Sequence, residues 1–150
     1  MNVKNEPLPR QMGQALGATS QLYQAYMDAL LRPHELTFSQ FAVLIFLARQ
    51  SAPVSISDIQ MRVALTQSAV TKVVQKFERL ALVEIIVDSA DKRTKRVALT
   101  SHGRRTALNL QMSFSEPFAE LLDGLPEEKQ EITVEVLNSL IAKLQSKLQS

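Results

Sequence analysis

The fold is decided by residues 66–80, which read TQSAVTKVVQKFERL. Apolar side chains recur in this stretch at spacings of three and four residues, which places them on one stripe of an α-helix. The stripe consists of Val70, Val73, Val74, Phe77 and Leu80. The sequence therefore predicts a helix that packs this stripe against a core.

The opposite side of the predicted helix is polar and basic. Hydroxyl and amide groups there can reach base edges in a DNA groove, and the candidates are Gln67, Ser68, Thr71 and Gln75. Cations can neutralise phosphates, and the candidates are Lys72, Lys76 and Arg79, with no carboxylate on this arc. For one isolated helix, a solvated surface would be the default interpretation. The flanking segments change that balance.

The segment before this helix predicts a second, shorter helix. Ser55 and Asp58 match a capping box, in which the two side chains bond the free backbone donors of a helix start. A helix over 56–63 should follow, with its inward side chains being Ile56, Ile59, Met61 and Val63. The chain then turns into Thr66, the expected cap of the next helix. Two short helices joined by a tight turn are typical of a helix-turn-helix.

The segment after the helix predicts a basic hairpin. Residues 82–88 and 95–99 are rich in β-branched side chains, which favours two strands. The cations of the connecting region are Lys92, Arg93 and Lys95, and their local acidic partners are Asp88 and Asp91. A basic hairpin beside a helix-turn-helix is a wing.

The wing has a specific motif. Residues 88–104 read DSADKRTKRVALTSHGR, which resembles the pattern Asp-Pro-x-Asp-x-Arg, a gap, then Val-x-Leu-Thr-x-x-Gly of the MarR family of winged-helix transcriptional regulators. Residues 68–72 likewise resemble that family's recognition-helix start, and the resemblance extends over nearly the whole chain. Three positions depart from the pattern: Ser89 replaces the usual Pro, Ala81 stands where Gly is common, and Ile85-Ile86 stand where Arg is frequent.

The resemblance implies a fold and a function. The fold would be mainly α with a small β-wing, in which a winged helix-turn-helix lobe over 37–100 lies between dimerisation helices over 8–32 and 101–148, all within one domain of residues 1–150. The function would be sequence-specific binding of double-stranded DNA by a homodimeric regulator, here a repressor acting on pseudo-palindromic operators. The family resemblance also implies that Arg93 enters the minor groove, oriented by Asp91.

The flanking helices can be predicted from their own patterns. A helix over 8–31 ends at Pro33, and Thr37 opens a second, nearly all-apolar helix over 38–50. Thr100 caps a helix that runs to Asp123, kinked near Phe114 because Pro117 lacks a backbone donor. A last helix begins after Gly124 and Pro126. The first and last helices carry apolar stripes that a second copy of the chain would cover.

Composition limits the function classes. Residues 55–105 have a net charge of +5 and the rest −3, so the basic charge is concentrated where DNA would bind. The chain has no cysteine, which excludes a thiol sensor, and it has no signal-peptide pattern or long apolar run, so we expect a cytoplasmic protein with no membrane partner. Two histidines and four scattered glycines form no metal or phosphate-binding motif, which predicts a non-enzyme without a cofactor.

Two questions stay open at this stage. A winged helix can also serve as a protein–protein interaction module, although the basic wing favours phosphate contact over the apolar contacts of such a module. The family resemblance further implies a small aromatic or anionic effector bound between the dimerisation helices and the lobe. Candidate contacts are Tyr23, Tyr26, His34, Phe38 and Phe41, for which packing in the core is the competing interpretation.

Overall fold

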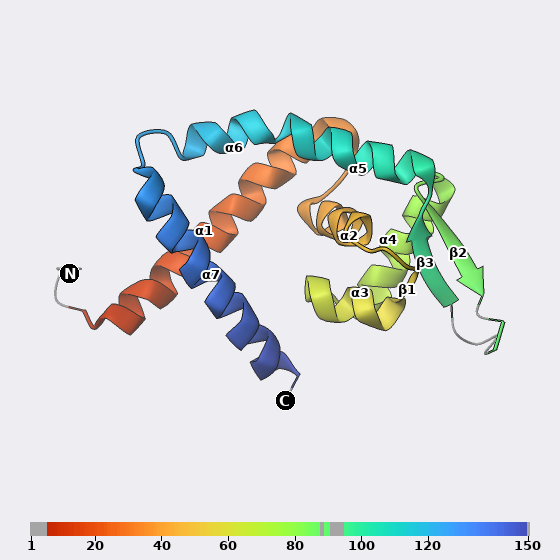
Figure 1. The fold of residues 1–150 in the computed structure, drawn as a ribbon, viewed down its shortest axis with the longest axis horizontal. Helices are drawn as coiled ribbons and strands as arrows, with labels where there is room; N and C mark the ends of the chain where they lie inside the picture. Colours follow the sequence, from red (N-terminus) through yellow and green to blue (C-terminus); the bar gives the residue numbers. More distant parts are fainter. Residues whose placement is uncertain (1–5, 88, 91–94, 150) are drawn as a thin grey trace. The chain divides into compact units, whose positions relative to one another are not determined.

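The computed structural model describes residues 6–87, 89–90 and 95–149, and the chain forms two compact units, residues 1–110 and 111–150. The first unit contains most of the secondary structure (Figure 1). Its elements are α1 (Leu8–Leu31), the 3-10 helix η2 (Arg32–His34), α2 (Phe38–Ala48), β1 (Val54–Ser55), α3 (Ile56–Val63), α4 (Gln67–Arg79), β2 (Val83–Val87), β3 (Lys95–Leu99) and the start of α5 (Ser101–Ser113). The predicted mainly α fold with a small β-wing is confirmed.

The wing sheet has three strands in the order β1-β3-β2, and both pairs are antiparallel. Val97 of β3 lies opposite Val54 on one side and Ile85 on the other. The sequence analysis predicted β2 and β3 but missed β1. A strand of two residues carries no periodicity of its own, and its only partner is a strand far along the chain.

Local hydrogen bonds fix the helix starts where they were predicted. In α3, the backbone N–H of Asp58 donates to Oγ of Ser55 at 3.1 Å, and the N–H of Ser55 donates to Oδ2 of Asp58 at 2.9 Å. The hydrogen bonds from Ser55 lower the pKa of the Asp58 carboxyl, and the positive charge of Arg96 adds to the effect. Thr37 forms the same kind of box with Gln40 at the start of α2, and Thr66 accepts the N–H of Ala69 at 3.2 Å.

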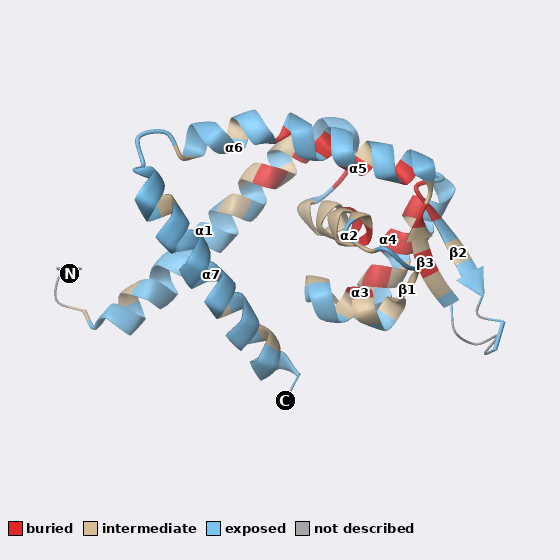
Figure 2. Cartoon of the chain, viewed as in Figure 1, coloured by how far each residue is buried: buried red, intermediate tan, exposed pale blue. Residues whose placement is uncertain are grey.

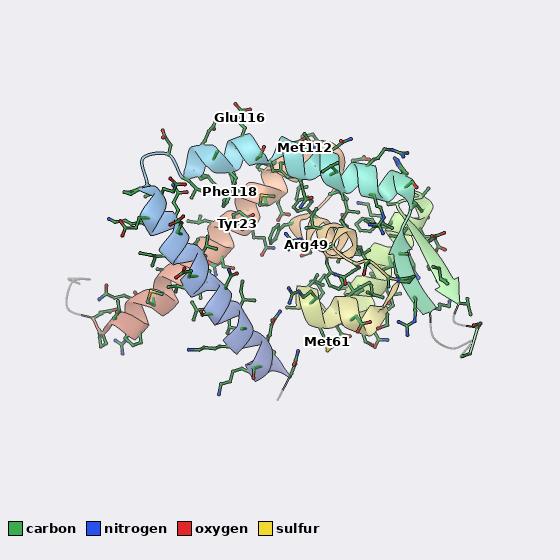
Figure 3. All side chains as sticks on the ribbon, viewed as in Figure 1. Tyr23, Arg49, Met61, Met112, Glu116 and Phe118 are labelled. Atoms are coloured by element: carbon green, nitrogen blue, oxygen red, sulfur yellow. The ribbon has the colours of Figure 1, made fainter. Side chains whose placement is uncertain are left out.

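The core of the first unit is built around α4 (Figure 2). Its fully buried large side chains are Phe77, Leu31, Leu44, Leu47, Ile59, Val43, Val70 and Val97, which come from α1, α2, α3, α4 and β3. Two side chains predicted to point inward do not. Leu80 is 49% exposed because it follows the last residue of α4, and Met61, two residues after Ile59 and so on the other side of α3, is 59% exposed (Figure 3).

Several short hydrogen bonds connect the end of α4, the wing and the start of α5. The chain leaves α4 through Ala81 in the left-handed conformation, at φ 55°. The hydroxyl of Thr100 donates to the Ala81 carbonyl at 2.7 Å and accepts the N–H of Gly103 at 3.0 Å. The N–H of Thr100 donates to the Leu82 carbonyl at 3.0 Å. The Leu-Thr-x-x-Gly part of the motif therefore joins the wing to the start of α5.

The second unit contains α6 (Ser115–Leu121) and α7 (Glu127–Leu148). The predicted break near Phe114 is present, since α5 ends at Ser113 and α6 begins at Ser115. Gly124 has the expected left-handed conformation, at φ 74°. No residue of α7 is buried. Among the described residues, no helix is both long enough and apolar enough to cross a lipid bilayer.

Candidate DNA-binding surface

The outer side of α4 presents the polar and basic side chains that the sequence analysis singled out. Those that are exposed are Gln67, Ser68, Lys72, Gln75 and Arg79, whereas Thr71 and Lys76 are half-buried. Glu78, in the last turn, is exposed as well, so the outer side of α4 does carry one carboxylate. Because Thr66 caps the helix, its first turn is ordered and Gln67 and Ser68 stand clear of the core.

Two of these side chains have partners inside the protein. The hydroxyl of Thr71 donates to the backbone carbonyl of Gln67 at 2.9 Å, which leaves its lone pairs available to accept a hydrogen bond. The ammonium of Lys76 donates to the carbonyl of Glu35 and to Oε1 of Gln40, the latter at 3.0 Å. Lys76 is therefore held at the edge of α4, next to the segment that joins α1 to α2.

The described part of the wing carries one of the predicted contact residues. Lys95 is exposed at the start of β3, where it pairs with Val87 of β2. The other candidates of the wing, namely Asp88, Asp91, Lys92 and Arg93, lie outside the described residues. The structure describes the three departures from the family motif. Ser89, Ala81 and Ile86 are exposed, and Ile85 is half-buried. Ala81 adopts the left-handed conformation, which explains why glycine is common there.

The lobe with this geometry matches known proteins. Residues 34–94 match the model of the MarR family, and this span includes α2, α3, α4 and β2. A MarR-family transcriptional regulator from Rhodococcus sp. RHA1 has the same fold, with a TM-score of 0.80 at 20% identity over 91% of this chain and 96% of that chain. Over residues 34–94 the chain therefore matches the MarR family, and its fold is the one that the solved MarR-type structures share. The described residues thus have the winged-helix fold of these transcriptional regulators.

Two other solved structures with this fold concern DNA binding or its regulation by a small molecule. A complex of MepR from S. aureus with DNA has a TM-score of 0.72 at 23% identity, over 89% of this chain and 97% of that chain. BpsR from Bordetella bronchiseptica, whose DNA binding is regulated by 6-hydroxynicotinic acid, has a TM-score of 0.73 at 25% identity, over 90% of this chain and 96% of that chain.

A hollow of about 480 Å³ opens between α2 and α3, within the first unit. It is lined by Phe38, Phe41, Ala42, Ile45, Phe46, Arg49, Gln50, Arg62 and Val63. Arg49 stands at the C-terminal end of α2, beside α3 (Figure 3). The hollow thus combines aromatic and aliphatic walls with two guanidinium groups.

The five predicted effector contacts do not all meet there. Phe38 and Phe41 line the hollow. Tyr23 packs edge-on against Phe38, with 5.4 Å between the ring centroids, and burial raises the pKa of its hydroxyl. Tyr26 is half-buried on α1 and His34 is exposed on η2, and neither is part of the lining. Sequence reasoning missed Arg49 and Arg62, because each lies on a different helix and no local spacing connects them.

Proposed function

We propose that this protein is a repressor of the MarR family, which binds pseudo-palindromic double-stranded DNA as a homodimer in the cytoplasm. The observation that carries the proposal is the exposed outer side of α4, whose capped N-terminus presents Gln67 and Ser68 beyond the core. In helix-turn-helix proteins, the N-terminal residues of the second helix contact base edges in the major groove. Gln75 and Thr71 continue the base-reading side, and Lys72 and Arg79 are the phosphate contacts. On this proposal the protein is a binding protein and has no catalytic site.

The homodimer is supported by the apolar side chains that the chain itself leaves exposed. On α1 these are Leu8, Met12, Leu16 and Leu22, and on α7 they are Ile132, Val134, Val136, Leu137, Ile141, Leu144 and Leu148. Exposed apolar surface of this extent marks an interaction site. A second copy of the chain would cover both helices and bring two copies of α4 to two half-sites. The helices over 8–32 and 101–148 are therefore the dimerisation helices of the proposal.

The test is binding to DNA selected from a random pool by the wild-type protein. We expect two half-sites about 10 base pairs apart, because two-fold-related recognition helices enter successive major grooves on one face of the duplex. Affinity should fall steeply as salt rises, since each phosphate contact releases counterions. If the winged helix were a protein–protein interaction module, titration across several salt concentrations would show neither selection nor salt dependence.

Lys72→Ala is the variant that tests the phosphate role. It should weaken binding to selected and random DNA alike, because phosphates carry no sequence information. The slope of log affinity against log salt should become shallower by about 0.9 for each phosphate that the protein no longer neutralises. The exposed Glu131, in the second unit, offers a control, since Glu131→Ala also removes one charge from the chain but should leave the slope unchanged. A loss confined to selected DNA would contradict a phosphate contact by Lys72.

A small aromatic carboxylate is the effector class that the hollow between α2 and α3 fits. Its ring would pack on Phe38 and Phe41, and its carboxylate would bind Arg49 or Arg62, whose guanidinium groups suit bidentate recognition. Such an effector releases the repressor if it binds the DNA-incompetent dimer better than the competent one. The regulation of BpsR by 6-hydroxynicotinic acid supports this class.

The effector proposal is tested with benzoate and its neutral counterpart benzamide. Benzoate should raise the melting temperature of the wild-type protein and weaken its DNA binding, whereas benzamide should have little effect because it lacks the charge. The double variant Arg49→Gln/Arg62→Gln, which removes both candidate partners of the carboxylate, should abolish the response to benzoate and retain DNA binding without the ligand. Equal stabilisation by both compounds, or stabilisation without a change in DNA affinity, would reject a regulatory anion site here.

A further inference from the structure

Lys76 differs from the other cations of α4 because its ammonium is already bound within the protein. Its Nζ donates to the backbone carbonyl of Glu35 and to Oε1 of Gln40. Glu35 belongs to the segment that joins α1 to α2, and Gln40 to the first turn of α2; they precede Lys76 by 41 and 36 residues in the chain. Lys72, one turn earlier on the same helix, is exposed.

The two acceptors are held in position by their own local structure. Glu35 closes the turn after η2 in the left-handed conformation, at φ 56°, and its N–H donates to the Arg32 carbonyl at 3.0 Å. Oε1 of Gln40 also accepts the backbone N–H of Thr37 at 3.2 Å, as part of the capping box of α2. The ammonium of Lys76 therefore meets a preformed pair of oxygen atoms.

The same segment is bound to α1. Oδ1 of Asp28 accepts the backbone N–H of Phe38 at 2.6 Å, and the ring of Phe38 contacts that of Tyr23 edge-on. A continuous series of contacts thus connects the C-terminal half of α1 with the start of α2, and the start of α2 with the third turn of α4. Side chains from the same network, including Asp28, Gln40 and Lys76, also line a shallow hollow of about 350 Å³.

We propose that Lys76 is a positioning residue. Its hydrogen bonds to Glu35 and Gln40 hold α4 beside the start of α2, and it affects DNA binding through the orientation of α4 and not by contacting phosphate. Two of its three N–H donors are used inside the protein. Its neighbours in the helix, Val73 and Phe77, are buried in the core, so Lys76 lies at the rim of the exposed side of α4. The inference rests on the proposed DNA binding and revises the phosphate role that the sequence predicted for this residue.

A positioning role and a phosphate contact differ in which DNA they affect. Base readout depends on hydrogen bonds that fail when the helix rotates slightly, whereas random DNA is bound by phosphate charge alone. Loss of the hydrogen bonds of Lys76 should therefore weaken binding to selected DNA and leave binding to random DNA unchanged. Loss of a phosphate contact weakens both equally.

The experiment compares Lys76→Met with Lys72→Met on selected and on random DNA at several salt concentrations. Lys76→Met should weaken binding to selected DNA about two- to tenfold, the effect of one hydrogen-bonded contact, with an unchanged salt slope. Lys72→Met should weaken both DNAs and make the slope shallower by about 0.9 per phosphate contact. A shallower slope for Lys76→Met, with equal losses on both DNAs, would overturn the inference while leaving the proposed function intact.

Gln40→Met provides the second variant, because it removes an acceptor and no cation. It should reproduce part of the loss on selected DNA, and the double variant Gln40→Met/Lys76→Met should bind no more weakly than Lys76→Met alone. Thr37→Ala is the matched control: it removes the other half of the capping box, leaves Oε1 of Gln40 in place and should bind both DNAs as the wild type does. Unchanged or tighter binding of selected DNA by Gln40→Met would refute the positioning role, because it would mean that the Lys76–Gln40 hydrogen bond does not contribute to DNA affinity. A wild-type protein that binds neither DNA would reject the proposed function and this inference together.

Discussion

Replacing Gly103 with alanine should destabilise the protein by about 3 kcal/mol or more, the upper end of what overpacking a closed core costs. A Cβ atom at this position would lie 2.0 Å from the carbonyl oxygen of Leu82 and 2.9 Å from its carbonyl carbon. These are backbone atoms, which cannot swing aside as the end of a long side chain can. For a chain of this size, the loss corresponds to a melting temperature lower by roughly 6–12 °C.

The surroundings explain why the junction cannot relax at small cost. The N–H of Leu82 donates to the Phe77 carbonyl at 2.8 Å, and its carbonyl accepts the N–H of Thr100 at 3.0 Å. Its side chain is 5% exposed, and Leu99, whose Cδ2 would lie 3.1 Å from the new Cβ, is equally buried. Moving the Leu82 carbonyl would therefore break hydrogen bonds on both sides and open the core under the wing.

Gly17→Ala is the control for this prediction. Gly17 lies within α1, and a Cβ added there would meet no other atom within 4 Å. Alanine favours a helix over glycine by up to about 1 kcal/mol, so this variant should be slightly more stable than the wild type. Thermal and denaturant unfolding would measure the stability of both variants against the wild type. A Gly103→Ala variant as stable as Gly17→Ala would show that the junction tolerates a side chain and that the glycine has another role.

The Gly103 junction illustrates what could be predicted from the sequence. The pattern Leu-Thr-x-x-Gly resembles that of the family, but the reason for its glycine is the close approach of α5 to the Leu82 carbonyl, which joins two residues far apart in the chain. The capping boxes at Thr37 and Ser55 were predictable because both partners lie within four residues of each other. Local patterns thus fixed where the helices begin.

Features that depend on distant partners could not be predicted in this way. The strand β1 exists because Val54 pairs with Val97. Lys76 was grouped with the other cations of α4 because a helical pattern does not show that Glu35 and Gln40 lie beside it. Arg49 and Arg62 line the same hollow only because α2 packs against α3. In each case the decisive contact comes from tertiary structure.

The double substitution Leu137→Glu/Ile141→Glu should convert the protein to a monomer and weaken its binding to paired half-sites by about 10²–10⁴-fold, the contribution that a second linked site makes to affinity. The two side chains lie one turn apart on α7 and are 39% and 49% exposed in the single chain. Carboxylates there cost little in the monomer, because water still reaches them. In a dimer interface they would be buried without partners, which is strongly unfavourable.

The control is Ala142→Glu/Ser146→Glu, which adds the same charge to the same helix at the same one-turn spacing. Neither position is three, four or seven residues from an exposed apolar side chain of α7, so both lie on another side of the helix, and both are exposed. This variant should remain dimeric and bind paired half-sites as the wild type does. Sedimentation equilibrium gives the oligomeric state, and titration on paired and single half-sites separates loss of dimerisation from a damaged DNA-binding surface. Since the α4 surface is untouched, the monomeric variant should bind a single half-site as tightly as one wild-type protomer does, and a dimeric Leu137→Glu/Ile141→Glu protein would show that α7 is not the interface.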